Sequence, residues 1–283
     1  DTIKMRFAVG NLMDLTGQPS LNSFDFLPGQ FVSLQFGEKS WRAYSIASLP
    51  TQDTLELIVR LVEGGVASES FRAAKIGDTY KFKGPFGHFV LSQNPEAELI
   101  FCATGTGIAP FRGMIQHEAA QKKPRKMTLL YGGRDTQDLA YLEEIADWAH
   151  GLSIKLALSR QEGNIALPIG VEDQFTWEKC RITKFLKEED FPPNTEVYIC
   201  GNGDMVVDTQ NILLEKGLPK DHLFMERFNG RLPCDIGWLV IPDSEASLKR
   251  MIRDLFYFLR TMKKTCDQEG QSRKRKPNLQ MIQ

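Results

Sequence analysis

A glycine-rich turn in the middle of the chain has the residue types and spacing of a phosphate-binding loop. Residues 103–112 (ATGTGIAPFR) follow an apolar run and open a helical pattern. Glycines let backbone N–H groups approach a pyrophosphate, and the amino end of a helix favours its negative charge. Pro110 suits the first turn of a helix but departs from the common G-x-G-x-x-G fingerprint. The turn is interpreted as a pyrophosphate site, with an ordinary strand-to-helix connection as the alternative.

Two further clusters combine charge, an aromatic ring and hydroxyl groups. Arg42 and Tyr44 alternate along a predicted strand, which places them on one face and offers a guanidinium for phosphate and a flat ring for stacking. Residues 64–71 (GGVASESF) form a glycine turn before a short helix, whose free N–H groups and Ser68 could hold a second phosphate pair. The alternatives are a surface arginine beside a half-buried tyrosine, and a helix start without a ligand.

These clusters occur with other short motifs in an order that resembles a known family. In chain order the motifs are Arg42-x-Tyr44-Ser45, Gly65-Val66-x-Ser68, Gly84-Pro85-x-Gly87-x-Phe89, residues 105–112 (GTGIAPFR) and Cys200-Gly201-Asn202. Each motif alone is weak to moderate evidence, but their order over residues 1–228 resembles the ferredoxin–NADP reductase superfamily. The resemblance implies a six-stranded antiparallel flavin-binding barrel, followed by a parallel-sheet domain that binds a nicotinamide dinucleotide.

The resemblance implies a flavin site in the first part of the chain. Arg42 would contact the flavin diphosphate, Tyr44 would stack on the flavin, and Ser45 would lie near its reactive N5 atom. The glycine turn would place four residues at the diphosphate: Gly65, Val66, Ala67 and Ser68. The implied cofactor is FAD, and FMN, which some relatives bind, is the alternative.

The resemblance also implies a nicotinamide site in the second part of the chain. Four residues of the glycine-rich turn would hold the dinucleotide pyrophosphate: Thr104, Gly105, Thr106 and Gly107. Cys200 and Gly201 match a motif whose cysteine approaches the nicotinamide ring. Without the resemblance, Cys200 would be interpreted as a small buried apolar residue at the end of a strand.

The choice between NADP and NAD depends on two residues after the strand at 154–158. Ser159 and Arg160 offer a hydroxyl and a guanidinium, which suit the dianionic 2′-phosphate of NADP. NADP is therefore expected rather than NAD, and a solvated loop arginine is the alternative.

The segment Glu226-Arg227-Phe228 resembles the acid-x-aromatic ending of many family members. The resemblance implies that Glu226 lies near the flavin ring, as a catalytic group together with Ser45 and Cys200. Phe228 would cover the flavin face that the nicotinamide must reach. This chain departs from the pattern, because it continues to residue 283.

The spacing of apolar residues predicts two unlike halves and an extension. Residues 1–94 carry short alternating runs between glycine and proline turns, which is typical of a small antiparallel barrel or sandwich. Residues 95–229 alternate apolar runs with helical patterns at 111–121, 139–150, 179–187 and 205–216, which predicts a parallel sheet. Residues 230–283 are a C-terminal extension with an amphipathic helix at 244–265 and a basic tail.

Composition argues against several other classes of protein. A formal net charge of -1 excludes the strongly basic surface of a general nucleic-acid-binding protein. Five cysteines without a C-x-x-C pair argue against a disulfide framework or a zinc site, and four scattered histidines have no metal-ligand spacing. No apolar stretch is long enough to span a membrane. We expect no bound metal, and a reducing compartment such as the cytoplasm.

The expected function is a flavin-dependent NAD(P)H oxidoreductase. It would pass electrons between NADPH and a one-electron acceptor, such as a ferredoxin, another iron–sulfur protein or a haem protein. A flavin suits this exchange because it takes electrons in pairs and also releases them singly. The alternative is a flavin-bearing electron-transfer subunit of a larger complex, docked through the C-terminal helix and inactive alone. The same basic, apolar-faced helix could instead lie on a membrane surface.

Overall fold

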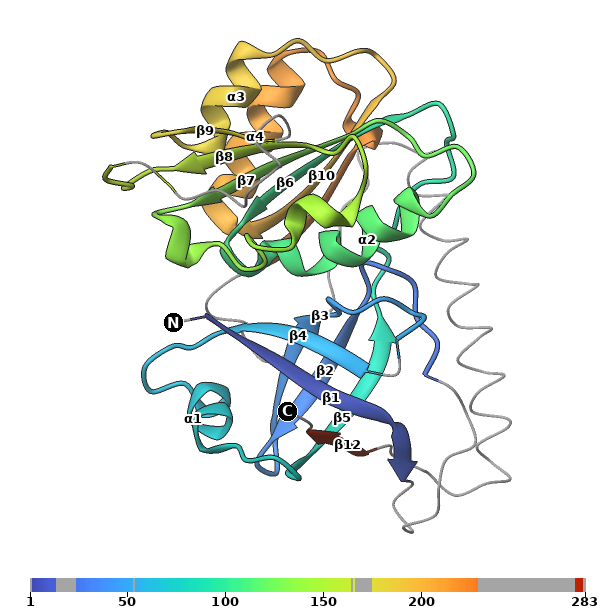
Figure 1. Ribbon diagram of the computed structural model, residues 1–283, viewed down its shortest axis with the longest axis vertical. Coiled ribbons are helices and arrows are strands. Elements are labelled where there is room, and N and C mark those ends of the chain that lie inside the picture. The colour runs from blue at the N-terminus through green and yellow to red at the C-terminus, as the bar shows by residue number, and fades with distance from the viewer. Residues whose placement is uncertain are drawn as a thin grey trace.

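The computed structural model describes residues 2–13, 24–52, 54–163, 165, 175–228 and 278–281. These residues form two six-stranded sheets, and helix α2 (Ala109–Ala119) lies between them (Figure 1). Each sheet has its own apolar core, and the second sheet carries one on each face. Among the described helices, none is both long and apolar enough to cross a membrane.

The first sheet is antiparallel, with the strand order β3-β2-β5-β12-β1-β4. Its alternating burial is clear in β2, where Val32, Leu34 and Phe36 face the core. The two edge strands also meet, because Ile46, directly after β3, forms a bridge with Leu57 of β4. The strands are β1 (Thr2–Met13), β2 (Phe31–Phe36), β3 (Ser40–Ser45), β4 (Thr54–Arg60), β5 (Thr79–Phe86) and β12 (Asn278–Met281).

One strand of this sheet comes from an unexpected part of the chain. All six strands were predicted within residues 1–94, but in the described residues five come from that range and the sixth is β12. The backbone of β12 pairs with β1 in the register Phe7↔Met281 and with β5 in the register Leu279↔Tyr80. Assigning residues 230–283 wholly to a separate extension is therefore wrong for this strand, because its backbone groups complete the ladder between β1 and β5.

The second sheet is parallel, as predicted, with the strand order β11-β10-β6-β7-β8-β9. Helices α3 (Ile182–Glu188) and α4 (Gly203–Glu215) cover one face, and α2 covers the face towards the first sheet (Figure 1). The chain order reverses between β6 and β10, and in open sheets of this kind ligands bind at the carboxyl ends of such strands. The strands are β6 (Glu98–Thr104), β7 (Met127–Gly133), β8 (Ser153–Leu158), β9 (Phe175–Glu178), β10 (Thr195–Asn202) and β11 (Leu223–Phe228).

The helix predicted at residues 139–150 is wrong. The structure has only the short 3-10 turns η2 (Thr136–Asp138) and η3 (Ile145–Trp148) there. Tyr141 adopts φ 67°, a left-handed conformation that interrupts any right-handed helix. The strand β9 was not predicted. The helix expected at 244–265 and the basic tail at 272–277 lie outside the described residues.

Candidate functional site

The glycine-rich turn and the Cys200-Gly201 motif are in direct contact at the carboxyl ends of β6 and β10. A Cβ on Gly107 would lie 2.1 Å from the Cys200 carbonyl oxygen, and a Cβ on Gly201 would lie 2.3 Å from Thr104 Oγ1. The backbone N–H of Asn202 donates to Thr104 Oγ1 at 3.1 Å. Both glycines are therefore required for this close approach, and the two predicted parts of a nicotinamide site are in contact, with Cys200 itself fully buried.

The turn itself has the geometry that a pyrophosphate needs. Residues Gly105–Ile108 form the 3-10 turn η1, which leads directly into α2. Gly105 has φ +54° and no atom within 4 Å of the position of its Cβ, so the space beside it is open. Its carbonyl oxygen accepts a hydrogen bond from the buried Tyr131 hydroxyl at 3.0 Å. N–H groups at the start of such a turn have no intrahelical partner, so the residues present fit a bound pyrophosphate.

Ser45 and Glu226 join the two sheets. Ser45 ends β3 and is buried, and its hydroxyl donates to Glu226 Oε2 of β11 at 3.0 Å. Glu226 pairs in register with Cys200 on the neighbouring strand β10. The three residues predicted as catalytic are therefore brought together, although they lie far apart in the sequence.

The protonation of this group is set by burial. Burial raises the pKa of Glu226 to about 7, and the hydrogen bond from Ser45 opposes that rise. Burial also raises the pKa of the Cys200 thiol well above its usual value, and the charge of Glu226 adds to the effect. The thiol therefore stays neutral, whereas the carboxyl group can hold or release a proton near neutral pH.

On the first sheet, the two clusters predicted to bind flavin are neighbours. Tyr44 of β3 is half-buried, and its ring lies 5.8 Å from the ring of Phe71 in helix α1 (Val66–Ala73). Burial raises the pKa of Tyr44, so its hydroxyl stays protonated. Arg42, two residues earlier on the same strand, donates from its Nη1 to the Trp41 carbonyl at 2.9 Å. The ring of Tyr44 thus packs against α1 through Phe71, and Arg42 lies on the same strand as Tyr44.

The turn before α1 leaves room for a charged ligand. Ser68 Oγ accepts from the Val62 N–H at 2.8 Å, and the Gly65 N–H donates to the Val62 carbonyl at 3.2 Å. These bonds fix the turn while the first N–H groups of α1, from Val66 to Ser68, have no partner within the helix. Gly64 has φ +67° and open space beside it. This arrangement fits a diphosphate.

Ser159 and Arg160 lie two strands away from the glycine-rich turn, directly after β8. The Ser159 N–H and hydroxyl both donate to the Gly133 carbonyl, at 3.0 and 3.3 Å, and the Arg160 N–H donates to the Arg134 carbonyl at 2.7 Å. Both side chains are exposed at the carboxyl edge of the sheet. For Phe228 the backbone pairs in register with Asn202, and its side chain lies outside the described residues.

A buried polar cluster between the sheets was missed by the sequence analysis. Glu56 of β4 is 3% exposed, and its carboxylate accepts hydrogen bonds from Arg6 and from the Tyr141 hydroxyl. Arg112 of α2 donates to the Ala47 carbonyl at 3.0 Å. The signal in the sequence is a carboxylate inside the apolar run of residues 55–59 (LELIV), because charged side chains are rarely fully buried unless they are paired.

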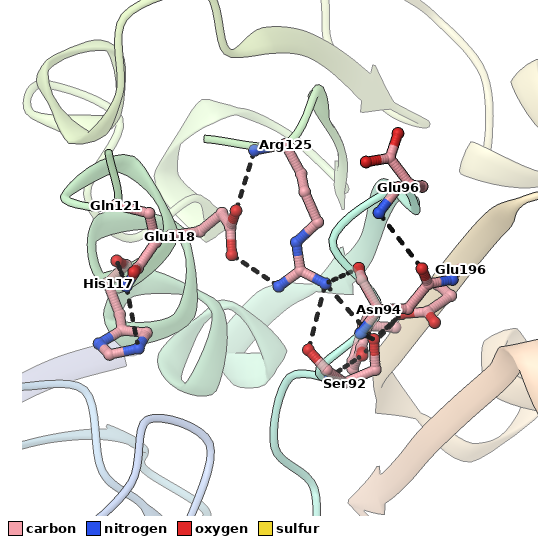
Figure 2. Close-up of polar contacts among 9 residues, drawn as sticks. Ser92, Asn94, Glu96, His117, Glu118, Gln121, Arg125 and Glu196 are labelled. Atoms are coloured by element: carbon pink, nitrogen blue, oxygen red, sulfur yellow. Dashed lines mark hydrogen bonds and ion pairs between the residues drawn. The ribbon is translucent and has the colours of Figure 1, made fainter. Parts of the chain in front are cut away.

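A second buried cluster lies at the opposite end of α2, where the chain passes between the sheets (Figure 2). Arg125 forms an ion pair with Glu118 at 2.6 Å and donates to the Ser92 carbonyl at 3.2 Å. Ser92 in turn donates from its hydroxyl to Glu196 of β10 at 2.6 Å. The described residues contain no group of three or more His, Cys, Asp and Glu side chains that could hold a metal ion.

Two family matches cover most of the described chain. Residues 11–91 match the oxidoreductase FAD-binding domain family, and residues 101–211 match the oxidoreductase NAD-binding domain family. Two sheets that carry these matches define an FAD-dependent NAD(P)H oxidoreductase.

A relative that matches across most of both chains identifies the family. Ferredoxin–NADP reductase B of Sorangium cellulosum is 31% identical over 73% of this chain and 87% of its own length. The chain belongs to the ferredoxin–NADP reductase superfamily, which confirms the resemblance carried by the five motifs. The expected cofactors, FAD and NAD(P), are confirmed at the level of the family.

Two other comparisons concern a solved structure with the same fold and an electron transfer component of a monooxygenase. The crystal structure of a ferredoxin NADP+ reductase from Neisseria gonorrhoeae with bound FAD and NADP has the same fold, with a TM-score of 0.62 at 24% identity over 80% of this chain and 98% of that one. The xylene/toluene monooxygenase electron transfer component of Pseudomonas putida is 30% identical over 74% of this chain. The chain spans only 59% of the length of that relative.

Proposed function

We propose that this protein transfers a hydride between NADPH and bound FAD and exchanges single electrons with a partner protein. The observation that carries the proposal is the hydrogen bond from Ser45 to Glu226, formed across the two sheets beside Cys200. Bound FAD supplies the exchange between two-electron and one-electron chemistry. The protein supplies the two binding surfaces and the polar group between them.

Within this proposal, the first sheet holds FAD. Arg42 and the first N–H groups of α1 neutralise the diphosphate, with Gly65, Val66, Ala67 and Ser68 forming the turn. Tyr44 would pack on the flavin, and Ser45, whose single hydroxyl proton is donated to Glu226, would lie beside its reactive nitrogen. The bridge between Ile46 and Leu57 supports a closed, barrel-like sheet, which would hold these residues on one rim.

The second sheet holds the nicotinamide dinucleotide in this proposal. Thr104, Gly105, Thr106 and Gly107 bind the pyrophosphate, while Cys200 and Gly201 line the position of the nicotinamide ring. The neutral Cys200 thiol fits there because it adds no charge beside a ring that changes charge during the reaction. Glu226 keeps a proton within reach of Ser45 near neutral pH.

We propose NADPH rather than NADH as the preferred donor. The support is the position of Ser159 and Arg160, whose side chains are exposed at the carboxyl edge of the sheet. A hydroxyl and a guanidinium recognise a phosphate dianion by charge-assisted hydrogen bonds. Replacing Arg160 by alanine should raise the KM for NADPH and leave the KM for NADH unchanged.

A second candidate function is an electron-transfer subunit that works only within an oxygenase assembly. The similarity to the xylene/toluene monooxygenase electron transfer component, and to the toluate 1,2-dioxygenase electron transfer component of Pseudomonas putida, favours this role. In either role we propose an iron–sulfur or haem protein as the acceptor, and a reducing compartment as the location. Phe228 is proposed to cover the flavin.

Anaerobic visible spectra test the proposal directly. The purified protein should show an oxidised flavin spectrum that bleaches at lower NADPH than NADH concentration. The Ser45→Ala protein should retain FAD but be reduced about tenfold more slowly or worse, because an interaction at the reacting centre is lost. Absence of flavin binding would refute the proposal. Rapid reduction by NADPH with electron release to ferricyanide but not to a free ferredoxin or cytochrome c would favour the subunit role.

A further inference from the structure

The segment of residues 45–48, which carries Ser45, is held by the first sheet through its backbone. The Ala47 N–H donates to the Glu56 carbonyl at 2.8 Å, and the Glu56 N–H donates to Ser48 Oγ at 3.1 Å. Ile46 forms the bridge with Leu57 described above. Glu56 therefore fixes this segment by its main chain, while its side chain points to partners on other elements.

The second sheet reaches the same segment through α2. Arg112 is 8% exposed, and it donates from Nη1 to the Ala47 carbonyl and from Nε to Glu144 Oε1, both at 3.0 Å. The next residue, Gly113, lies close to the same segment, since a Cβ there would be 3.4 Å from the Ser48 carbonyl oxygen. The helix that begins at the glycine-rich turn thus contacts the backbone two residues from Ser45.

Tyr141 makes a second connection between the same two parts. Its hydroxyl donates to the buried carboxylate of Glu56, and its ring lies 4.2 Å from Lys4 Nζ and 5.2 Å from the Arg112 guanidinium. The residue before it is tied to the glycine-rich turn, since the Ala140 N–H donates to the Tyr131 hydroxyl at 2.9 Å and that hydroxyl donates to the Gly105 carbonyl. The left-handed backbone of Tyr141 shows that local preference alone does not place it there.

We propose that Tyr141 and Arg112 are positioning residues that set how the Ser45 segment sits on the second sheet, and thereby the distance from nicotinamide to flavin. The inference rests on the proposed function, because it assigns these residues to the hydride-transfer geometry. Neither residue is required to touch a cofactor. Transfer between two bound groups depends steeply on their approach, and a displacement of about 1 Å can lower a rate by about 10²-fold.

The test compares two buried tyrosines whose hydroxyls each donate to a glutamate. Tyr141→Phe removes the hydrogen bond to Glu56 between the sheets. The matched control, Tyr198→Phe, removes the bond at 3.2 Å to Glu196, whose carboxylate also accepts from Ser92. Arg112→Lys is a further variant, which keeps the charge but lacks the forked donor that reaches Ala47 and Glu144 together.

Two measurements are made on each protein. In rapid-mixing experiments with NADPH, the limiting rate of flavin reduction should fall at least about tenfold in Tyr141→Phe and Arg112→Lys, with NADP affinity unchanged within about twofold. In the protein as purified, without NADPH, hydrogen exchange at residues 45–56 should become faster in these two variants and not in Tyr198→Phe. This second measurement does not depend on catalysis.

The possible results separate the two proposals. A Tyr141→Phe rate within twofold of the control, or unchanged exchange at residues 45–56, would overturn the positioning role. A wild-type protein that neither NADPH nor NADH reduces would overturn the proposed function, while the exchange data would still judge the contact. If Tyr141→Phe does not fold, Arg112→Lys decides the question by the same two criteria.

Discussion

The two ends of α2 carry buried ion-pair clusters that look alike but have different surroundings. At one end Glu118 pairs with Arg125, and their side chains are 6% and 8% exposed. At the other end Glu56 pairs with Arg6, whose side chain is 50% exposed, and also accepts from Tyr141. The cluster of Glu118 and Arg125 is enclosed, and it fixes the chain where it passes between the sheets (Figure 2). The cluster of Glu56 and Arg6 lies beside the segment that carries Ser45. Similar chemistry thus serves stability at one end of the helix and, as we propose, geometry at the other.

The largest expected effect on stability follows from breaking the enclosed pair. Glu118→Ala leaves the buried Arg125 guanidinium without its carboxylate, and such a change costs about 3–5 kcal/mol. Urea unfolding should show a loss of this size, whereas the limiting rate of flavin reduction should stay within about twofold. A large loss of rate in folded Glu118→Ala protein would contradict the contrast between the two clusters.

Glu226 sharpens the comparison, because its half-buried carboxyl group lies beside a hydroxyl rather than beside a cation. Its pKa is raised from the ordinary value to about 7, so the folded protein must lose a proton that the unfolded chain loses at lower pH. The wild-type unfolding free energy should therefore fall between about pH 4.5 and pH 7, by up to about 3 kcal/mol. To test this, the unfolding free energy is measured at pH 5 and at pH 8. The Glu226→Gln protein should lack the fall between these two pH values that the wild type shows. If the unfolding free energy of the variant falls as much as that of the wild type, the fall is caused by another titrating group.

Glu56→Gln should have a smaller effect on stability than Glu118→Ala, because Arg6 remains half exposed to water. A loss of about 1–2 kcal/mol is expected in urea unfolding at neutral pH. The rate of flavin reduction should fall clearly, in contrast to Glu118→Ala. If Glu56→Gln loses stability but its flavin is reduced at the wild-type rate, both clusters serve stability alone.

The contribution of Glu56 to the unfolding free energy has the opposite pH dependence to that of Glu226. Burial alone would raise the pKa of Glu56, but the hydrogen bonds from Tyr141 and Arg6 and the charge of Arg112 outweigh burial and lower it. Its contribution is present above the unfolded pKa of about 4.3 and is lost as pH falls through the folded pKa. The stability difference between wild type and Glu56→Gln should therefore shrink from pH 6 to pH 3. A difference that grows towards low pH would contradict this sign.

The smallest expected effect concerns the first turn of α1, which belongs to neither cluster. Ser68→Ala removes the acceptor for the Val62 N–H and should cost about 1 kcal/mol. FAD affinity should also fall, because the turn that presents the diphosphate-binding N–H groups is less well fixed. Unchanged affinity in a destabilised protein would separate the turn from the proposed diphosphate site.

Much of the fold was predictable because its signals are local. Period-two burial in β2 and the alternation of strands with helices in the second half follow directly from the order of residues. The glycines at 107 and 201 signal close backbone approach, although the sequence alone does not say to which partner. Tyr141 was predicted to be helical because the apolar spacing of residues 139–150 is helical, while its contact with Glu56, eighty-five positions away in sequence, overrides that preference. The same non-local pairing explains why β12 was not predicted as a member of the first sheet.

The strand β12 has a consequence for the order in which the chain folds. It joins β1 and β5, so the first sheet pairs residues from near both ends of the sequence, such as Phe7 and Met281. The second sheet draws all its strands from residues 98–228. During synthesis from the amino end, the second sheet can therefore form while β1 and β5 still lack the strand between them. The first sheet, most of whose strands are made before the second sheet, is then completed after it.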